Sequence, residues 1–199
     1  MKRKRLKFKK LLNEYRSRDF ELQYVEEILK EADHEFEIYY RQYCANNNID
    51  IAELNKQHAP RVENMLSSTA VDLAAINNTA VRDPYCPRKI FKDIARRLHP
   101  DKLSEDHPDK KKYEEDFKKA TDAVQGSKWG ELFSIVDEYN IATKQYDEIN
   151  DALRRDIEKI EKIISKRKNS YSWLLFSCDG DADCMDNVVR KFLNHLFNI

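Results

Sequence analysis

The chain has 199 residues, 36% of them charged and 41% hydrophobic, which is too hydrophobic a composition for a disordered protein. Three glycines and five prolines are few, and this scarcity favours long helices over strands joined by tight turns. No apolar run approaches the roughly 18 to 20 residues that cross a bilayer, and none follows the basic start as in a secretory signal, so we expect a cytoplasmic, all-α protein without membrane contact.

A net charge of zero conceals a basic start and an acidic remainder. Seven of the first ten residues are basic, so residues 11–199 hold 29 of the 36 basic residues against 36 acidic ones, a net charge of −7. This negative net charge of residues 11–199 argues against broad nucleic-acid binding. The basic start (Lys2, Arg3, Lys4, Arg5, Lys7, Lys9 and Lys10) is the only candidate for contact with nucleic acid, and a solvated terminus is the simpler interpretation.

Residues 5–45 are predicted to form one long helix, because apolar residues recur there at three- and four-residue steps with charged residues between them. These apolar residues are Leu12, Tyr15, Tyr24, Ile28, Phe36, Tyr39 and Tyr43. The run Asn46-Asn47-Asn48 is expected to end the helix. Residues 49–87 are less informative: the apolar residues between 66 and 76 permit a further helix, and Asp83-Pro84 and Cys86-Pro87 indicate a loop.

The clearest helix begins at Pro87, which suits a first helical turn because its missing N–H costs nothing there. It should end near Leu98, because Pro100 disfavours helical geometry at His99. Its apolar face consists of Ile90, Phe91, Ile94, Ala95 and Leu98. The rest of its surface is basic, through Arg88, Lys89, Lys92, Arg96 and Arg97, opposed only by Asp93.

After a polar loop to about residue 106, a second helix is expected to start near Pro108, capped by Asp106 or His107, and to end at Gly126. Ser127 can cap the next helix. The apolar pattern extends that helix from Trp129 to about Asn140.

Residues 142–166 carry apolar residues at steps of three and four in a highly charged background, which is typical of a helix packed along another helix. We expect an antiparallel coiled pair with residues 5–45. Asp179-Gly180-Asp181 lacks the full calcium-loop pattern and is interpreted as a plain turn before a last apolar helix. The chain then divides into residues 1–58, a central region 59–141 with a core hairpin at 87–125, and residues 142–199.

The cysteines and histidines indicate neither a metal site nor an enzyme. Cys44, Cys86, Cys178 and Cys184 lack the spacing of a zinc site, and without a secretory signal reduced thiols are expected. The histidines (His34, His58, His99, His107 and His195) form no nucleophile or metal constellation, and no glycine-rich phosphate loop is present. We therefore expect no metal, no cofactor and no enzymatic activity.

Residues 87–124 resemble the central hairpin of a J-domain, the module of DnaJ-like co-chaperones. The resemblance lies in the basic helix "IFKDIARRL", the tetrapeptide His99-Pro100-Asp101-Lys102, a loop and the helix "YEEDFKKATDAV". Phe117 in the second helix also matches the family. The usual tyrosine–leucine–glycine signature is absent from residues 80–86, so the first family helix must be atypical or lie in residues 60–80. The chain is similar to divergent, auxilin-like or phage-type members.

The resemblance implies that the basic helix docks on a DnaK-type chaperone (the 70-kDa heat-shock family) and that the tripeptide stimulates ATP hydrolysis by that partner. The implied docking residues are Arg88, Lys89, Lys92, Arg96, Arg97 and Lys102, with His99, Pro100 and Asp101 as the trigger. The tetrapeptide recurs as His107-Pro108-Asp109-Lys110. Only the first copy is expected to function, because use of the second would require a helix through Pro100, at a cost of about 3 kcal/mol; the second is interpreted as a helix start.

Other functions remain open on the sequence. In the co-chaperone hypothesis the flanking helices bring an unknown client or fix a location, and they can also form a homo-oligomer. The main alternative is a helical structural or interaction protein, including one of viral origin, that uses a J-like hairpin as a scaffold. A third hypothesis is nucleic-acid binding through residues 1–10 and the basic helix, with an affinity that falls steeply with salt.

Overall fold

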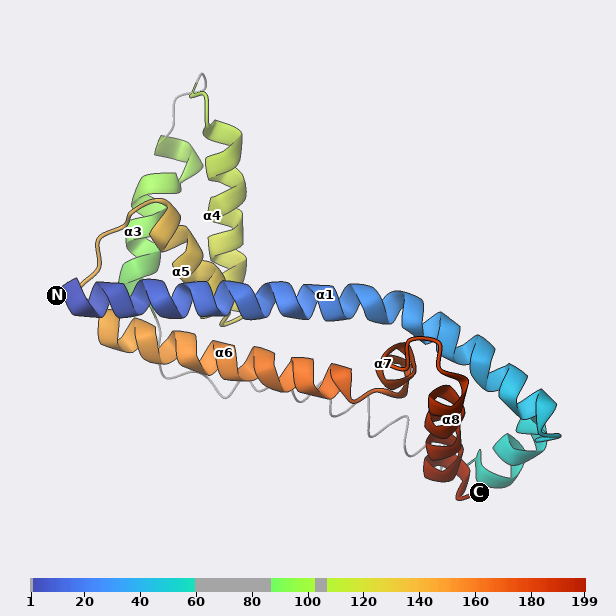
Figure 1. Cartoon of the computed structure of the whole chain (residues 1–199). Coiled ribbons are helices and arrows are strands. Elements are labelled where there is room, and N and C mark those ends of the chain that lie inside the picture. Colours follow the sequence, from blue (N-terminus) through green and yellow to red (C-terminus); the bar gives the residue numbers. More distant parts are fainter. Residues whose placement is uncertain (1, 60–86, 103–106) are drawn as a thin grey trace. The chain divides into compact units, whose positions relative to one another are not determined.

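The computed structural model describes residues 2–59, 87–102 and 107–199, and this part of the chain is helical without any strand (Figure 1). The all-α prediction is therefore confirmed. The elements are α1 (Lys2–Asn46), α3 (Arg88–Leu98), a 3-10 turn η1 (Pro100–Lys102), α4 (Lys110–Gln125), α5 (Trp129–Glu138), α6 (Tyr146–Lys168), α7 (Tyr171–Phe176) and α8 (Ala182–Phe197). Residues 51–59 are also helical. The helix and loop expected between residues 60 and 86, and any family helix in residues 60–80, lie outside the described residues.

None of the described helices is both long and apolar enough to cross a membrane. The long helix α1 begins three residues earlier than expected, so the basic run forms its first turns. It ends at Asn46 as predicted, and Asn48 takes a positive φ of 54° just beyond it. Asparagine tolerates this left-handed conformation better than most residues, which explains the stop.

Two expected helix caps are wrong, although both helices start close to the expected residues. Helix α4 begins at Lys110, two residues after Pro108, and the capping position is Asp109 rather than Asp106 or His107, because Pro108 and Asp109 form a turn of their own. Ser127 does not cap α5: it takes a positive φ of 53°, and Lys128 precedes the helix without a side-chain hydrogen bond. Gly126 ends α4 as predicted, but with an ordinary right-handed φ of −83°.

The described residues fall into two compact units. The first unit contains residues 2–19, 87–102 and 107–160, and the second contains residues 20–59 and 161–199. Each long helix therefore contributes its first part to one unit and its last part to the other. The linear division into residues 1–58, 59–141 and 142–199 stays a prediction.

The first unit is built around α3, α4 and α5, with the first turns of α1 and α6 completing its core. Its fully buried side chains come from all five helices: Leu12, Ile94, Leu98, Ala120, Ala123, Leu132, Phe133, Ile149, Ala152 and Leu153. Burial of this apolar surface is the main source of stability for a helical domain. The core fixes α3 and α4 as the two arms of a helical hairpin.

The N-terminus of α5 is held by two long-range contacts. The Asp156 carboxylate of α6 accepts a hydrogen bond from the Gly130 N–H (2.9 Å), one of the N–H groups that a helix start leaves without an intrahelical partner. Burial raises the pKa of this carboxyl, although the backbone hydrogen bond and Lys159 act in the opposite direction. The buried ring of Tyr15 lies so close to Gly130 that a Cβ there would be 2.1 Å from the ring. Glycine is therefore required for α1 to pack against α5.

The antiparallel orientation expected for the two long helices is wrong in the first unit. Lys4 forms an ion pair with Asp147, and the Phe8 and Tyr146 rings lie 5.9 Å apart, so both helices begin at the same end. About ten residues further along each helix, Tyr15 of α1 and Asp156 of α6 both lie beside Gly130, so the two helices advance in the same direction. The helices thus run parallel here (Figure 1). Apolar periodicity cannot distinguish the two directions, because it reports which face is buried but not the direction of the partner.

The second unit has its own core, in which Cys44, Leu175, Val189, Leu193 and Phe197 are buried. Asp179 and Gly180 have positive φ values of 49° and 82°, and Asp181 caps α8 by accepting a hydrogen bond from the Cys184 N–H (2.8 Å). This is the turn expected from the sequence.

The expectation of reduced thiols is wrong at this turn, because Cys178 and Cys184 are joined in a disulfide with a Cα–Cα distance of 5.7 Å. The tight turn between them brings the two cysteines within bonding range. Cys44 is a free, buried thiol whose pKa is raised by burial.

Candidate functional site

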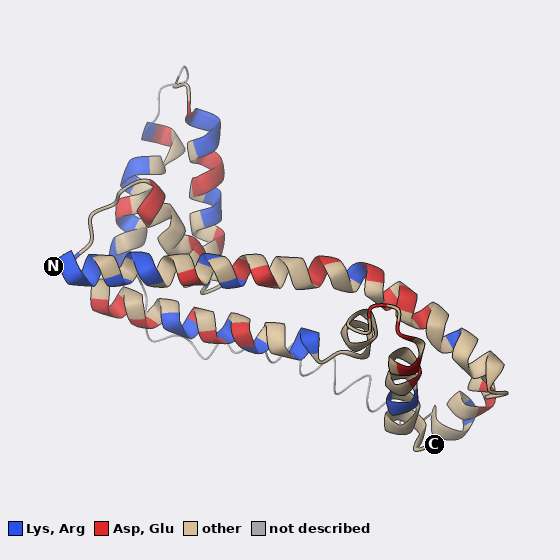
Figure 2. Ribbon diagram, viewed as in Figure 1, with Lys and Arg blue, Asp and Glu red and all other residues tan. Residues whose placement is uncertain are grey.

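Helix α3 is amphipathic, with one apolar, buried face and one basic, exposed face. Ile90, Ile94 and Leu98 are buried, with 2% or less of each exposed. The basic residues predicted to face a partner are all exposed: Arg88, Lys89, Lys92, Arg96 and Arg97. Figure 2 shows the lysine and arginine positions of α3 in blue. Asp93 pairs with Arg96 at 3.0 Å. A partner with an acidic surface would therefore meet several cations presented on one rigid helix.

The first His-Pro-Asp tripeptide forms an exposed turn directly after this helix. His99 ends α3 with an extended backbone (φ −62°, ψ 129°), as expected for a residue before proline. The Asp101 N–H donates to His99 Nδ1 (3.3 Å), and the Lys102 N–H donates to the His99 carbonyl (3.0 Å). The Asp101 side chain is 86% exposed and the imidazole is 39% exposed. The turn thus offers a carboxylate to a partner beside a partly covered imidazole.

The imidazole of His99 is oriented by packing and by this hydrogen bond. Its ring meets the edge of Phe117 on α4 at a centroid distance of 5.1 Å, and Phe91 of α3 stacks on the same phenyl ring at 6.1 Å. The His99 Nδ1 accepts the Asp101 N–H and lies 3.6 Å from the Asp101 carboxylate. The arrangement preorganises the turn, which lowers the entropy cost of recognition.

The second tripeptide forms a similar turn, which was not predicted from the sequence. The Asp109 N–H donates to His107 Nδ1 (3.1 Å), and the Lys110 N–H donates to the His107 carbonyl (3.0 Å). The His107 ring lies 5.3 Å from Tyr113 on α4. The repeated His-Pro-Asp-Lys sequence could have predicted this second turn. Two identical short sequences with proline at the same position have the same backbone preferences.

A buried polar contact holds α4 to α5 behind the two turns. The Tyr139 hydroxyl donates to Asp116 Oδ2 (2.8 Å), and Lys119 donates to Oδ1 of the same carboxylate (3.1 Å). Burial and the hydrogen bond to Asp116 raise the pKa of Tyr139. The Tyr139 ring also meets Tyr113 edge-on at 5.2 Å. These contacts fix the helix face on which both histidine rings rest.

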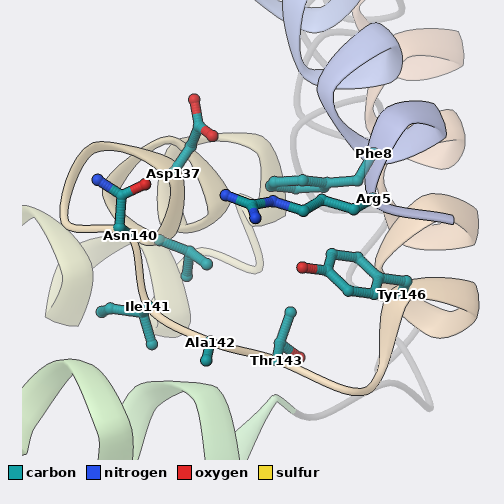
Figure 3. A pocket seen from close by; sticks show the side chains of 9 residues that line it. Arg5, Phe8, Asp137, Asn140, Ile141, Ala142, Thr143 and Tyr146 are labelled. Carbon is teal, nitrogen blue, oxygen red and sulfur yellow. The ribbon is translucent and has the colours of Figure 1, made fainter. Parts of the chain in front are cut away.

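The basic N-terminus has partners within the first unit. Lys4 pairs with Asp147, and Lys9 lies 3.7 Å from Asp137. Arg5 lines a hollow of about 140 Å³ beside Asp137 and Tyr146 (Figure 3). This volume is below the roughly 300 to 1,000 Å³ of typical small-molecule pockets. The hollow therefore does not favour a substrate site.

No cluster of three or more potential metal ligands occurs among the described residues. Comparison of the chain with protein-family models, curated proteins and solved structures gives no match.

Proposed function

We propose that this chain is a J-domain co-chaperone that docks on a DnaK-type chaperone and stimulates its ATP hydrolysis through His99-Pro100-Asp101. The observation that carries the proposal is the exposed turn at the end of a helix whose outer face is basic. The resemblance of residues 87–124 to a J-domain hairpin supplies the identity of the partner. The flanking helices would then serve to bring a client or to fix the location of the complex.

The proposed mechanism separates attraction from triggering. Arg88, Lys89, Lys92, Arg96 and Arg97 would steer the acidic face of the ATPase domain toward α3, because charge complementarity raises the encounter rate and fixes the orientation. The exposed Lys102 would extend that surface. His99 and Asp101 would then contact the partner and favour its hydrolytic state, which requires that they bind that state more tightly than the other.

The test measures ATP turnover by DnaK-type chaperones from several sources, with and without the purified chain. Wild type is expected to raise turnover about fivefold or more, at the lower end of typical coupling between sites. His99→Gln should return it to the basal rate. His34→Gln, an exposed histidine on α1, is the matched control and should behave as wild type.

A second pair of variants tests the docking surface. Arg96→Glu with Arg97→Glu should shift half-maximal stimulation to much higher concentration, and high salt should mimic the effect on wild type. The matched double reversal on α8, Arg190→Glu with Lys191→Glu, should change little. If the wild-type chain leaves turnover unchanged with every chaperone tested, the co-chaperone proposal is wrong and the scaffold alternative is favoured.

A further inference from the structure

The second tripeptide, His107-Pro108-Asp109, is not used by the proposed function, yet it repeats two hydrogen bonds of the first turn. In each copy the aspartate N–H donates to the histidine Nδ1, at 3.3 Å in the first and 3.1 Å in the second. In each copy the lysine N–H donates to the histidine carbonyl at 3.0 Å. The two turns therefore hold a histidine ring, a proline and an aspartate with the same backbone hydrogen bonds.

Both turns rest on one face of α4. The first imidazole packs on Phe117 and the second on Tyr113, at 5.1 and 5.3 Å between ring centroids. These two aromatic residues are four positions apart on the helix, so their Cβ atoms are roughly 5 to 6 Å apart on the same side. A partner that approaches the first turn is consequently within reach of the second.

Cations also lie beside the second turn, although they follow it rather than precede it. Asp109 is exposed, and Lys110 and Lys111 follow at the start of α4, where Lys111 is exposed. The first turn is preceded by the cations of α3. Each copy thus combines an exposed carboxylate with neighbouring cations, so a surface that fits one copy carries the groups that fit the other.

We propose that His107-Pro108-Asp109 is a second contact site for the same DnaK-type chaperone, an inference that rests on the proposed function. The two copies differ in what precedes them: the first is rigidly attached to the basic helix α3, and the second precedes α4. The first copy couples docking to hydrolysis. The second adds to the affinity of the docked complex without setting its maximal rate.

The test titrates the full-length chain into a chaperone that wild type stimulates, comparing Asp109→Asn with Asp101→Asn. Asparagine keeps the backbone N–H that bonds to the histidine ring, so each turn is retained while its carboxylate charge is lost. Asp109→Asn is expected to raise the concentration for half-maximal stimulation about two- to fivefold, as for the loss of one exposed charged contact, with the maximum retained. Asp101→Asn is expected to lower the maximum itself.

His107→Gln provides a second variant and should shift the half-maximal concentration in the same direction. Asp122→Asn, an exposed aspartate on α4, is the control for charge loss and should leave the curve unchanged, and circular dichroism checks that each variant is folded. If the stimulation curves of Asp109→Asn and His107→Gln coincide with that of wild type while Asp101→Asn remains defective, this inference alone is overturned. A wild-type chain that stimulates no chaperone removes the proposed function and this inference together.

Discussion

The contact between Tyr15 and Gly130 provides a test of how α1 packs in the first unit. A Cβ at position 130 would lie 2.1, 2.3 and 2.4 Å from three atoms of the Tyr15 ring, which is itself only 6% exposed. Because the ring is packed in the core, it cannot swing into solvent and must displace its neighbours. Gly130→Ala therefore creates an overpacked core, which typically costs 1 to 3 kcal/mol, here toward the upper end at about 3 kcal/mol.

The gain in helix propensity from alanine offsets at most about 1 kcal/mol of that cost. We expect Gly130→Ala to lower the free energy of unfolding by about 2 kcal/mol, which corresponds to roughly 4 to 8 °C in Tm for a chain of this length. Gly126→Ala is the matched control: its new Cβ would meet the Asp122 carbonyl oxygen at 3.3 Å, and its φ of −83° suits alanine. That variant should lie within about 0.5 kcal/mol of wild type.

Urea unfolding followed by tryptophan fluorescence can isolate the first unit. The chain has two tryptophans, of which Trp129 is buried in the first unit and Trp173 lies in the second. In a Trp173→Phe background, Trp129 alone reports the unfolding of interest. Introducing Gly130→Ala into a Tyr15→Ala protein should cost much less than in wild type, because the clash is gone. Equal stability of the Gly130→Ala and Gly126→Ala proteins would refute the packing of α1 on α5.

Two further predictions concern Asp156 and the disulfide. Burial raises the pKa of the Asp156 carboxyl above its usual 3.8, so its contribution to stability is present in acid and is lost as pH rises through the raised pKa. Asp156→Asn should abolish this part of the pH dependence in urea titrations, because it keeps an oxygen for the Gly130 N–H but cannot ionise. Asp156→Ala removes that oxygen and should cost about 1 to 3 kcal/mol, with the larger cost in acid. Identical pH profiles for wild type and Asp156→Asn would contradict the assignment. Reduction of the Cys178–Cys184 disulfide, or Cys184→Ser, should lower the free energy of unfolding of the second unit by about 2 kcal/mol. Mass spectrometry of the unreduced protein after alkylation must find neither Cys178 nor Cys184 alkylated.

The hairpin was the most predictable part of the fold. Pro100 restricts His99 to extended geometry, so α3 ends at Leu98 as the sequence predicts. The apolar spacing of Ile90, Ile94 and Leu98 identified the buried face, which left the basic residues exposed. These features depend on steric restrictions and periodicity within a few residues, and such short-range effects are contained in the sequence itself.

Other features were decided by contacts between residues far apart in the chain. The parallel course of α1 and α6 and the requirement for glycine under Tyr15 depend on which surfaces meet. The second His-Pro-Asp was predicted only as a helix start, and α4 does begin directly after it. Proline suits both a helix start and a turn, and the packing of the His107 ring on Tyr113 is visible only in the structure. Local sequence limits the conformations open to each segment, and tertiary packing selects among them, because only the folded chain determines what each side chain contacts.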